Sequence, residues 1–144
     1  MSSGSEYEAV VGYSRAVRTG PYVAVAGTTG SGDGAAEQAQ DALRRIAIAL
    51  QDVGAALSDV VRTRIYVTDI SRSGDVGAVH AQVFGDIMPA ATMVEVSALI
   101  APEYLVEIEV DAYVVGAEKR PDRPERRATA PAVRTGRRAP ARTA

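Results

Sequence analysis

The segment "LVEIEVDAYVV", residues 105–115, alternates apolar and polar residues as a β-strand with two different faces does. One face would carry Val106, Ile108, Val110 and Ala112, and the other Glu107, Glu109, Asp111 and Tyr113. The apolar face needs a cover. The segment therefore predicts a sheet with helices packed on one side and a charged side left without helices.

Four further segments are rich in the β-branched and aromatic residues typical of strands. They span residues 7–17, 22–27, 59–70 and 92–99. Gly20-Pro21 separates the first two segments and is a turn signal, so we expect a hairpin there. Pro102 breaks the chain between the last two strands.

Two segments carry the spacing of a helix. From Ala35 to Val53 the apolar residues recur every three or four positions, and Gly54 predicts the end of that helix. A shorter helix is expected over residues 75–84, with its apolar side formed by Val76, Val79, Val83 and Phe84. The order is β-β-α-β-α-β-β. It predicts an α+β fold, a two-layer sandwich with both helices on one face of a sheet.

The helix-free face of this sheet is expected to be charged. It would hold Arg62, Arg64, Glu95, Glu107, Glu109 and Asp111, mixed with Met93, Tyr66 and Tyr113. One interpretation is a solvated face whose charges pair with one another. The other is an interface with a second subunit, at whose edges small-ligand clefts would form. The alternation alone leaves both open.

Size and composition exclude several classes of protein. A chain of 144 residues is expected to be one domain, and no apolar run approaches the ~20 residues of a membrane span. The N-terminus lacks a secretory signal pattern, so a cytoplasmic protein is expected. The absence of Cys excludes disulfides and thiolate chemistry. The single histidine, His80, excludes a His-rich metal site, and we expect it exposed on the second helix, outside any catalytic triad.

The charge divides the chain into two parts. Residues 1–118 hold 16 acidic and 7 basic residues, whereas residues 119–144 hold 2 acidic and 9 basic residues. The tail is rich in Pro, Arg and Ala and cannot bury enough apolar surface to order itself, so disorder is predicted. Weak nucleic-acid binding is expected only through this tail. The alternative interpretation is that the tail is a solvated extension without a specific role.

Several stretches together carry a family resemblance. They are "GYSRAVRTGPYVAVAGTTG" (12–30), "GAALSDVVRTRIYVTDI" (54–70), "MPAATMVEVSAL" (88–99) and "LVEIEVDA" (105–112). Their order and spacing make the body, roughly residues 7–115, resemble the Rid family (reactive intermediate deaminases, also called YjgF). The resemblance implies a chorismate-mutase-like fold and a homotrimer. The helix-free faces would meet in a central barrel, and a small molecule would bind in each cleft between subunits.

The resemblance also implies chemistry without a cofactor: hydrolysis of 2-imino acids and their enamine tautomers to 2-keto acids and ammonia. Members with this activity grip the substrate carboxylate through an Arg in a Pro-small-Arg-Ser/Thr motif. The matching stretch here is Pro89-Ala90-Ala91-Thr92, with Ala91 at the Arg position. Each charge-assisted hydrogen bond lost is worth roughly 1.5–3 kcal/mol. We therefore expect a different substrate, namely a small imine, enamine or related carbonyl compound, to be hydrolysed, dehydrated or cyclised.

The resemblance assigns site residues one by one. Glu107 matches the cleft glutamate that helps position the water, and Tyr13 matches the cleft tyrosine, so these two are the expected catalytic residues. The expected substrate-binding positions are Thr92, Ala91, Gly27 and Thr28, with Arg15 and Arg64 as possible replacement cations. Structural roles are the alternatives: an ion pair of Glu107 with Arg62 or Arg64, and packing of Tyr13 at a subunit seam.

Three functions stay open at this level. The first is the enzyme just described. The second is a non-catalytic trimer that binds a metabolite as a sensor or regulates a partner enzyme. The third is RNA cleavage, which an acidic body does not favour because cleavage needs cations near phosphate.

Overall fold

A computed structural model describes residues 6–116. The predicted tail, residues 119–144, lies outside the described residues, as does the predicted domain end at residue 118. None of the helices described is long and apolar enough to cross a membrane. The elements are α1 (Glu6–Val11), β1 (Ala16–Thr19), β2 (Tyr22–Thr29), α2 (Ala35–Asp52), η1 (Leu57–Asp59), β3 (Val60–Val67), η2 (Ile70–Arg72), α3 (Ser73–Phe84), β4 (Ala90–Glu95) and β5 (Val106–Tyr113).

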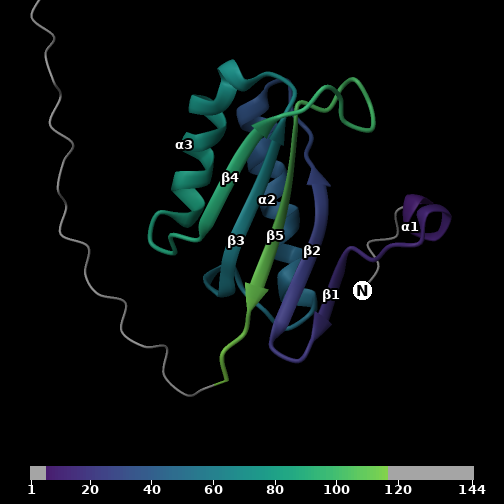
Figure 1. The fold of residues 1–144 in the computed structure, drawn as a ribbon, viewed down its shortest axis with the longest axis vertical. Coiled ribbons are helices and arrows are strands. Elements are labelled where there is room, and N and C mark those ends of the chain that lie inside the picture. The colour runs from purple at the N-terminus through teal and green to yellow at the C-terminus, as the bar shows by residue number, and fades with distance from the viewer. Residues whose placement is uncertain (1–5, 117–144) are drawn as a thin grey trace, which may run out of the picture.

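The five strands form one sheet in the order β1-β2-β5-β3-β4. All neighbours run antiparallel except β3 and β4, which are parallel and are connected through α3. In Figure 1, α2 lies behind the sheet and α3 lies beside β4, next to α2, while no helix of residues 6–116 covers the front. The α+β fold with two helices on one face is thereby confirmed.

Local sequence explains the hairpin and the long helix. Thr19 pairs with Tyr22 across a two-residue turn, in which Gly20 takes the positive φ of 59° that such turns favour. Helix α2 ends as expected, since Gly54 has φ 72°. Its buried face includes Ala39, Ala42, Leu43, Ile46, Ala49 and Leu50.

The core lies between the helices and the apolar face of the sheet. In the central strand β5, Val106, Ile108, Val110 and Ala112 are each at most 1% exposed, as the alternation predicted. Gly30 allows α2 to approach the end of β2 closely, because a Cβ at this position would lie only 2.7 Å from the Ala42 nitrogen. The tight contact fixes α2 beside β2, where the candidate site lies.

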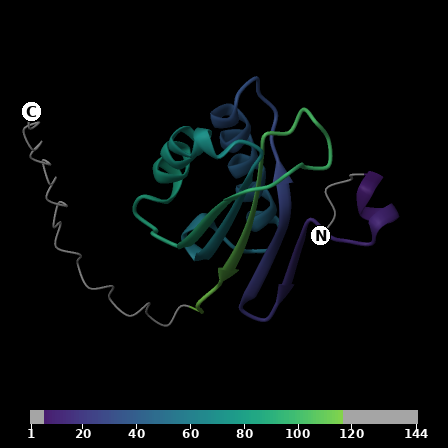
Figure 2. The same cartoon turned by 45° about the horizontal axis from the view of Figure 1, so that its top comes forward.

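The first predicted strand is only partly a strand. Residues Glu6–Val11 form the short helix α1, and β1 begins at Ala16. The N–H groups of Gly12 and Tyr13 both donate to the Glu8 carbonyl, and Gly12 has φ 81°, so the helix ends in the glycine-assisted turn typical of helix C-termini. Figure 2 shows α1 standing clear of the sheet beside β1.

The faces of β4 are opposite to those predicted. The register pairs Ile65 with Met93 and Val67 with Glu95, so Met93 and Glu95 lie on the helix side. Met93 packs against the core, whereas Val94 is 41% exposed. Glu95 accepts a hydrogen bond from the Ile70 N–H at 2.8 Å. Strand β4 lies at the edge of the sheet and has apolar residues at adjacent positions. The sequence pattern therefore could not decide which set of alternate residues faces the helices.

The helix-free face, which we call the open face, pairs its charges within one chain. Arg64 lies between two carboxylates, 2.9 Å from Glu109 Oε1 and 3.1 Å from Asp111 Oδ2. Tyr22 donates to Asp111 at 2.7 Å, and Tyr66 to Glu109 at 3.3 Å. The open face is therefore a connected polar network flanked by exposed apolar and aromatic groups, among them Val94 and Tyr113.

Candidate functional site

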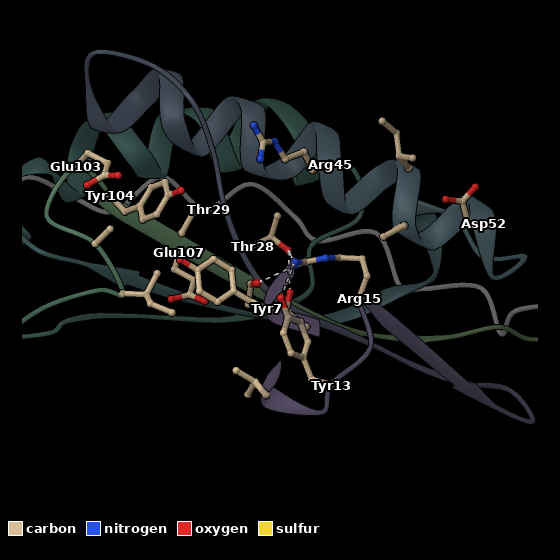
Figure 3. A pocket seen from close by; sticks show the side chains of 17 residues that line it. Tyr7, Tyr13, Arg15, Thr28, Thr29, Arg45, Asp52, Glu103, Tyr104 and Glu107 are labelled. Atoms are coloured by element: carbon tan, nitrogen blue, oxygen red, sulfur yellow. Dashed lines mark hydrogen bonds between the residues drawn. The ribbon is translucent and has the colours of Figure 1, made fainter. Parts of the chain in front are cut away.

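A pocket of about 910 Å³ lies beside β2. Its walls come from α1, α2, the second half of β2 and the loop that follows β4, and Glu107 of β5 reaches it. Strand β1 pairs only with Tyr22–Val25, so within residues 6–116 the rest of β2 has no strand on that side. In Figure 3 the pocket runs along α2, with Glu103 and Tyr104 at one end and Asp52 at the other.

A β-bulge shapes the polar part of the pocket. In the β2–β5 register Val25 pairs with Val110 and Thr28 with Ile108, so Ala26 and Gly27 together oppose one residue of β5. Bulges re-aim side chains and are frequent next to active sites. A Cβ at Gly27 would overlap the Glu107 carboxylate, only 2.9 Å from its Cδ. Gly27 thus leaves the space in which Glu107 lies.

Arg15 connects the neighbouring groups. Its Nη1 donates to the Gly27 carbonyl at 2.9 Å and to Thr28 Oγ1 at 3.0 Å, while Nη2 lies 3.4 Å from the Tyr13 hydroxyl. The Arg15 Cζ is 5.8 Å from the centre of the Tyr13 ring, within cation–π range. Figure 3 shows these side chains joined by hydrogen bonds on the pocket wall. Two of the five guanidinium N–H groups have no partner among residues 6–116 and remain for a ligand.

Glu107 is the electrostatically unusual group of the pocket. Its carboxyl is half-buried, and within residues 6–116 no group donates a hydrogen bond to it. Burial raises the pKa of Glu107 above the usual 4.5, the negative charge of Glu109 raises it further, and Arg15 partly opposes both. A carboxyl group with a raised pKa that is open to a pocket can take up and release a proton closer to neutral pH.

Five of the predicted site residues meet in this pocket: Tyr13, Arg15, Gly27, Thr28 and Glu107. The predicted alternative, an ion pair of Glu107 with Arg62 or Arg64, is wrong, because Arg64 is held by Glu109 and Asp111 on the open face and Arg62 forms no ion pair with a described residue. Arg64 is therefore not a cation of this pocket.

Ala91 and Thr92 lie elsewhere in the chain. They belong to β4, the edge strand at the opposite side of the sheet from β1, and pair with Thr63 and Arg64 of β3. Both side chains are exposed. A single chain therefore does not bring these two positions to Glu107.

The expectation of an exposed His80 is wrong. This side chain is half-buried over the sheet, where Nε2 shares a hydrogen bond of 2.9 Å with Thr63 Oγ1. Its ring also packs on Phe84, with the two centroids 4.7 Å apart. Burial lowers the pKa of His80 below 6.5. Sequence spacing could not reveal this contact because β3 and α3 meet only in the tertiary fold.

Other pocket residues escaped the sequence reasoning. The sequence pattern predicts Tyr7 in a strand, and no motif marks Arg45, Ile48 or Tyr104 as pocket residues. Ile48 did carry a signal, because it is a large apolar residue on the polar side of α2. Within residues 6–116 no three His, Cys, Asp or Glu side chains gather to hold a metal ion.

The protein is an α+β two-layer domain. It has one sheet with two helices on a single face and a pocket beside a bulged strand. Comparison with known families is specific: the family model described as Endoribonuclease L-PSP matches residues 3–114. The chain belongs to this family, which is also known as the Rid or YjgF family. The resemblance drawn from the sequence motifs is thereby confirmed.

Individual relatives agree. The crystal structure of Rv2704 from Mycobacterium tuberculosis, a member of the YjgF/YER057c/UK114 family, is 72% identical, covers 79% of this chain and 97% of its own, and gives a TM-score of 0.78. An uncharacterized Streptomyces coelicolor protein is 34% identical over 121 residues, 78% of this chain and 90% of the relative. A RutC family protein of Pyrococcus abyssi is 34% identical over 110 residues, 70% of this chain and 85% of the relative.

Proposed function

We propose that the protein is a cofactor-free enzyme that acts on a small reactive imine or enamine, or a related carbonyl intermediate, in the pocket around Glu107. The observation that carries this proposal is the Glu107 carboxyl itself. It is half-buried, it receives no hydrogen bond from residues 6–116, its pKa is raised, and it faces a pocket with a cation and a tyrosine.

Hydrolysis of an imine requires few groups. Water adds to the C=N carbon and one of its protons moves to the nitrogen, which gives a carbinolamine. The hydroxyl of the carbinolamine then loses its proton to form the C=O bond, the nitrogen takes up that second proton, and the C–N bond breaks to release ammonia. Glu107 is suited to take the proton from the water and return it to the nitrogen, since a raised pKa eases both transfers near neutral pH. Tyr13 donates a hydrogen bond to the reacting group, and the pocket walls hold water and substrate together.

Arg15 supplies the positive charge at this site. Its guanidinium is fixed by Gly27 and Thr28, and its two remaining N–H groups suit a carbonyl or carboxylate oxygen of the substrate. Ala91 offers no such group, so ordinary 2-imino acid deamination is expected to be weak. The substrate is one that needs only the Arg15 contact.

A homotrimer would complete the site. In the proposed assembly the open faces of three chains meet, and the β4 edge of one chain, with Ala91 and Thr92, approaches the Glu107 pocket of the next. The paired charges and exposed aromatic groups of the open face support a contact with further protein. The clefts would then lie between subunits.

The decisive experiment generates imines in place with an amino-acid oxidase and follows their disappearance and the release of ammonia. Wild type is compared with Ala91→Arg, and Ala81→Arg adds the same charge on an exposed part of α3 as a control. Gain of turnover only in Ala91→Arg means that the machinery is intact and that carboxylate recognition is missing. Turnover of amino-acid imines by wild type overturns our interpretation of Ala91.

Carboxylate-free imines and enamines form the second arm. We expect wild type to accelerate their decay and Glu107→Gln to lose that effect. Unchanged decay rates for every compound and variant, together with tight ligand binding, would establish the second candidate function, metabolite binding without turnover. That alternative is favoured by Ala91 alone.

RNA is the third substrate to assay, because the matching family model is described as an endoribonuclease. Residues 1–118 carry 16 acidic and 7 basic side chains, which repel a phosphate backbone. We expect no cleavage. RNA cleavage that is lost in Arg15→Met would contradict the imine proposal.

A further inference from the structure

The pocket has an apolar part that the chemistry around Glu107 does not use. Four large apolar or aromatic side chains line it while remaining widely exposed: Tyr7 at 58%, Val11 at 67%, Ile48 at 46% and Ile100 at 72%. They come from α1, α2 and the loop after β4. Exposed apolar residues scattered singly need no explanation, but a group that converges on one pocket indicates a ligand surface.

Ile48 is the most telling member of this group. Its helical neighbours three and four positions away are Arg44, Arg45, Gln51 and Asp52, all of them exposed and polar. An amphipathic helix normally keeps this side polar. A large aliphatic residue at its centre that faces the pocket therefore has no role in the core.

The size of the pocket points the same way. About 910 Å³ is near the top of the roughly 300–1,000 Å³ range of pockets that hold drug-sized ligands. The polar groups Tyr13, Arg15 and Glu107 account for one region only. An imine or carbonyl group of a few atoms fills that region and leaves the apolar walls uncovered.

We infer that the substrate carries a bulky apolar or aromatic substituent beside its reacting group, and that Ile48 and Tyr7 determine this specificity. The inference rests on the proposed function, which makes this pocket the substrate site. The polar head lies at Arg15 and Glu107, and the substituent lies between α1, α2 and the loop that holds Ile100. Short or hydrophilic substrates bind weakly because they leave apolar surface in contact with water.

Binding of stable ketones tests this without turnover. Butan-2-one through octan-2-one are titrated into isotope-labelled protein, and affinity is measured from the chemical-shift changes. We expect affinity to rise about fourfold per added methylene, the equivalent of ~0.8 kcal/mol for each buried CH₂. Ile48→Ser and Tyr7→Ser should flatten this dependence, so that the loss of affinity grows with the length of the ketone. Arg15→Met should weaken every ketone by a similar factor.

Ile70→Ser is the matched control, because Ile70 is 44% exposed on η2, outside the pocket. It should keep the full chain-length dependence. An affinity that ignores chain length, or a dependence that Ile48→Ser leaves intact, overturns the inference. The inference is also overturned if Ile48→Ser changes the sedimentation of the protein and leaves ketone binding unchanged. The four apolar side chains of the pocket would then form a contact between copies of the chain. Failure of turnover in the imine assay, by contrast, leaves the ketone result unaffected.

Discussion

At the scale of single residues, two titratable groups stand out, and their electrostatic environments act in opposite directions. Burial and Glu109 raise the pKa of Glu107, which disfavours its charged form in the folded state. Burial lowers the pKa of His80, which favours its neutral form. Both shifts make the folded protein sensitive to pH, with different signs.

Replacing Glu107 with Gln should separate function from stability. We expect catalysis to fall roughly 10²–10⁴-fold, the usual effect of losing a general acid or base. Thermal stability should rise at pH 7, because the folded state no longer holds a disfavoured charge, and the gain should disappear below the usual pKa of 4.5, where the carboxyl is protonated in both states. Asp86→Asn, an exposed change outside the pocket, is the control. A variant less stable than wild type at pH 7 would contradict the assignment.

His80 predicts the opposite pH dependence. The lowered pKa means that the contribution of His80 to folding is complete above 6.5 and is lost as the pH falls through its value in the folded protein. We expect denaturant titrations to show unfolding free energy decreasing between pH 7 and pH 5, and His80→Gln to reduce that decrease. Because the chain has one histidine, the comparison is direct. The comparison of wild type with His80→Gln should also be made in chains that carry Glu107→Gln, because the pH dependence of Glu107 has the opposite sign.

At the scale of elements, strand β2 organises the site. Its bulge at Ala26 and Gly27 turns Thr28 into a buried position, 3% exposed, where the hydroxyl both accepts from Arg15 and donates to the Ala26 carbonyl. The missing side chain of Gly27 provides the room for Glu107. One irregular strand thus places a cation and a carboxyl on the same pocket.

Gly27→Ala tests this arrangement. The added Cβ would overlap the Glu107 carboxylate, so we expect a loss of about 1–3 kcal/mol in unfolding free energy and displacement of Glu107, with impaired turnover. Gly77→Ala is the matched change, since nothing lies within 4 Å of its Cβ position in α3. It should stabilise by ~0.5–1 kcal/mol, because alanine favours the helix. Equal effects of the two substitutions in a thermal melt would contradict the claim that a side chain at position 27 overlaps Glu107.

At the scale of the whole molecule, one side of the sheet is covered by helices and the other presents the open face. There Arg64 links Glu109 and Asp111, beside Tyr22 and Tyr66. In the proposed trimer this network lies between subunits. That arrangement brings the β4 edge of one chain to the Glu107 pocket of the next chain.

Charge reversal at Arg64 tests the assembly. Wild type should sediment at about three times the monomer mass of 15.1 kDa. Arg64→Glu would place three carboxylates together, and we expect it to shift the protein toward the monomer. Arg72→Glu reverses another ion-paired arginine, exposed on η2 and paired with Asp75, and should leave the mass unchanged. A monomeric wild type, or equal masses for all three proteins, would contradict the trimer.

The sequence by itself determined the fold, because period-two and period-3.6 patterns depend only on which residues must be buried together. Both long helices, the Gly20-Pro21 hairpin and the faces of β3 and β5 followed from those patterns. Motif resemblance also identified the family and four residues of the pocket, namely Tyr13, Gly27, Thr28 and Glu107.

Only the tertiary structure decided what depends on contacts between distant segments. The two faces of β4 are opposite to those predicted from the sequence. The register of β4 with β3 is set by the connection through α3, and the apolar pattern of the strand does not determine it. Contacts between separate elements also placed His80 on Thr63 and Arg15 in the pocket, and they paired Arg64 with Glu109 and Asp111. Side-chain direction at each of these positions follows from packing between elements, which no local pattern encodes.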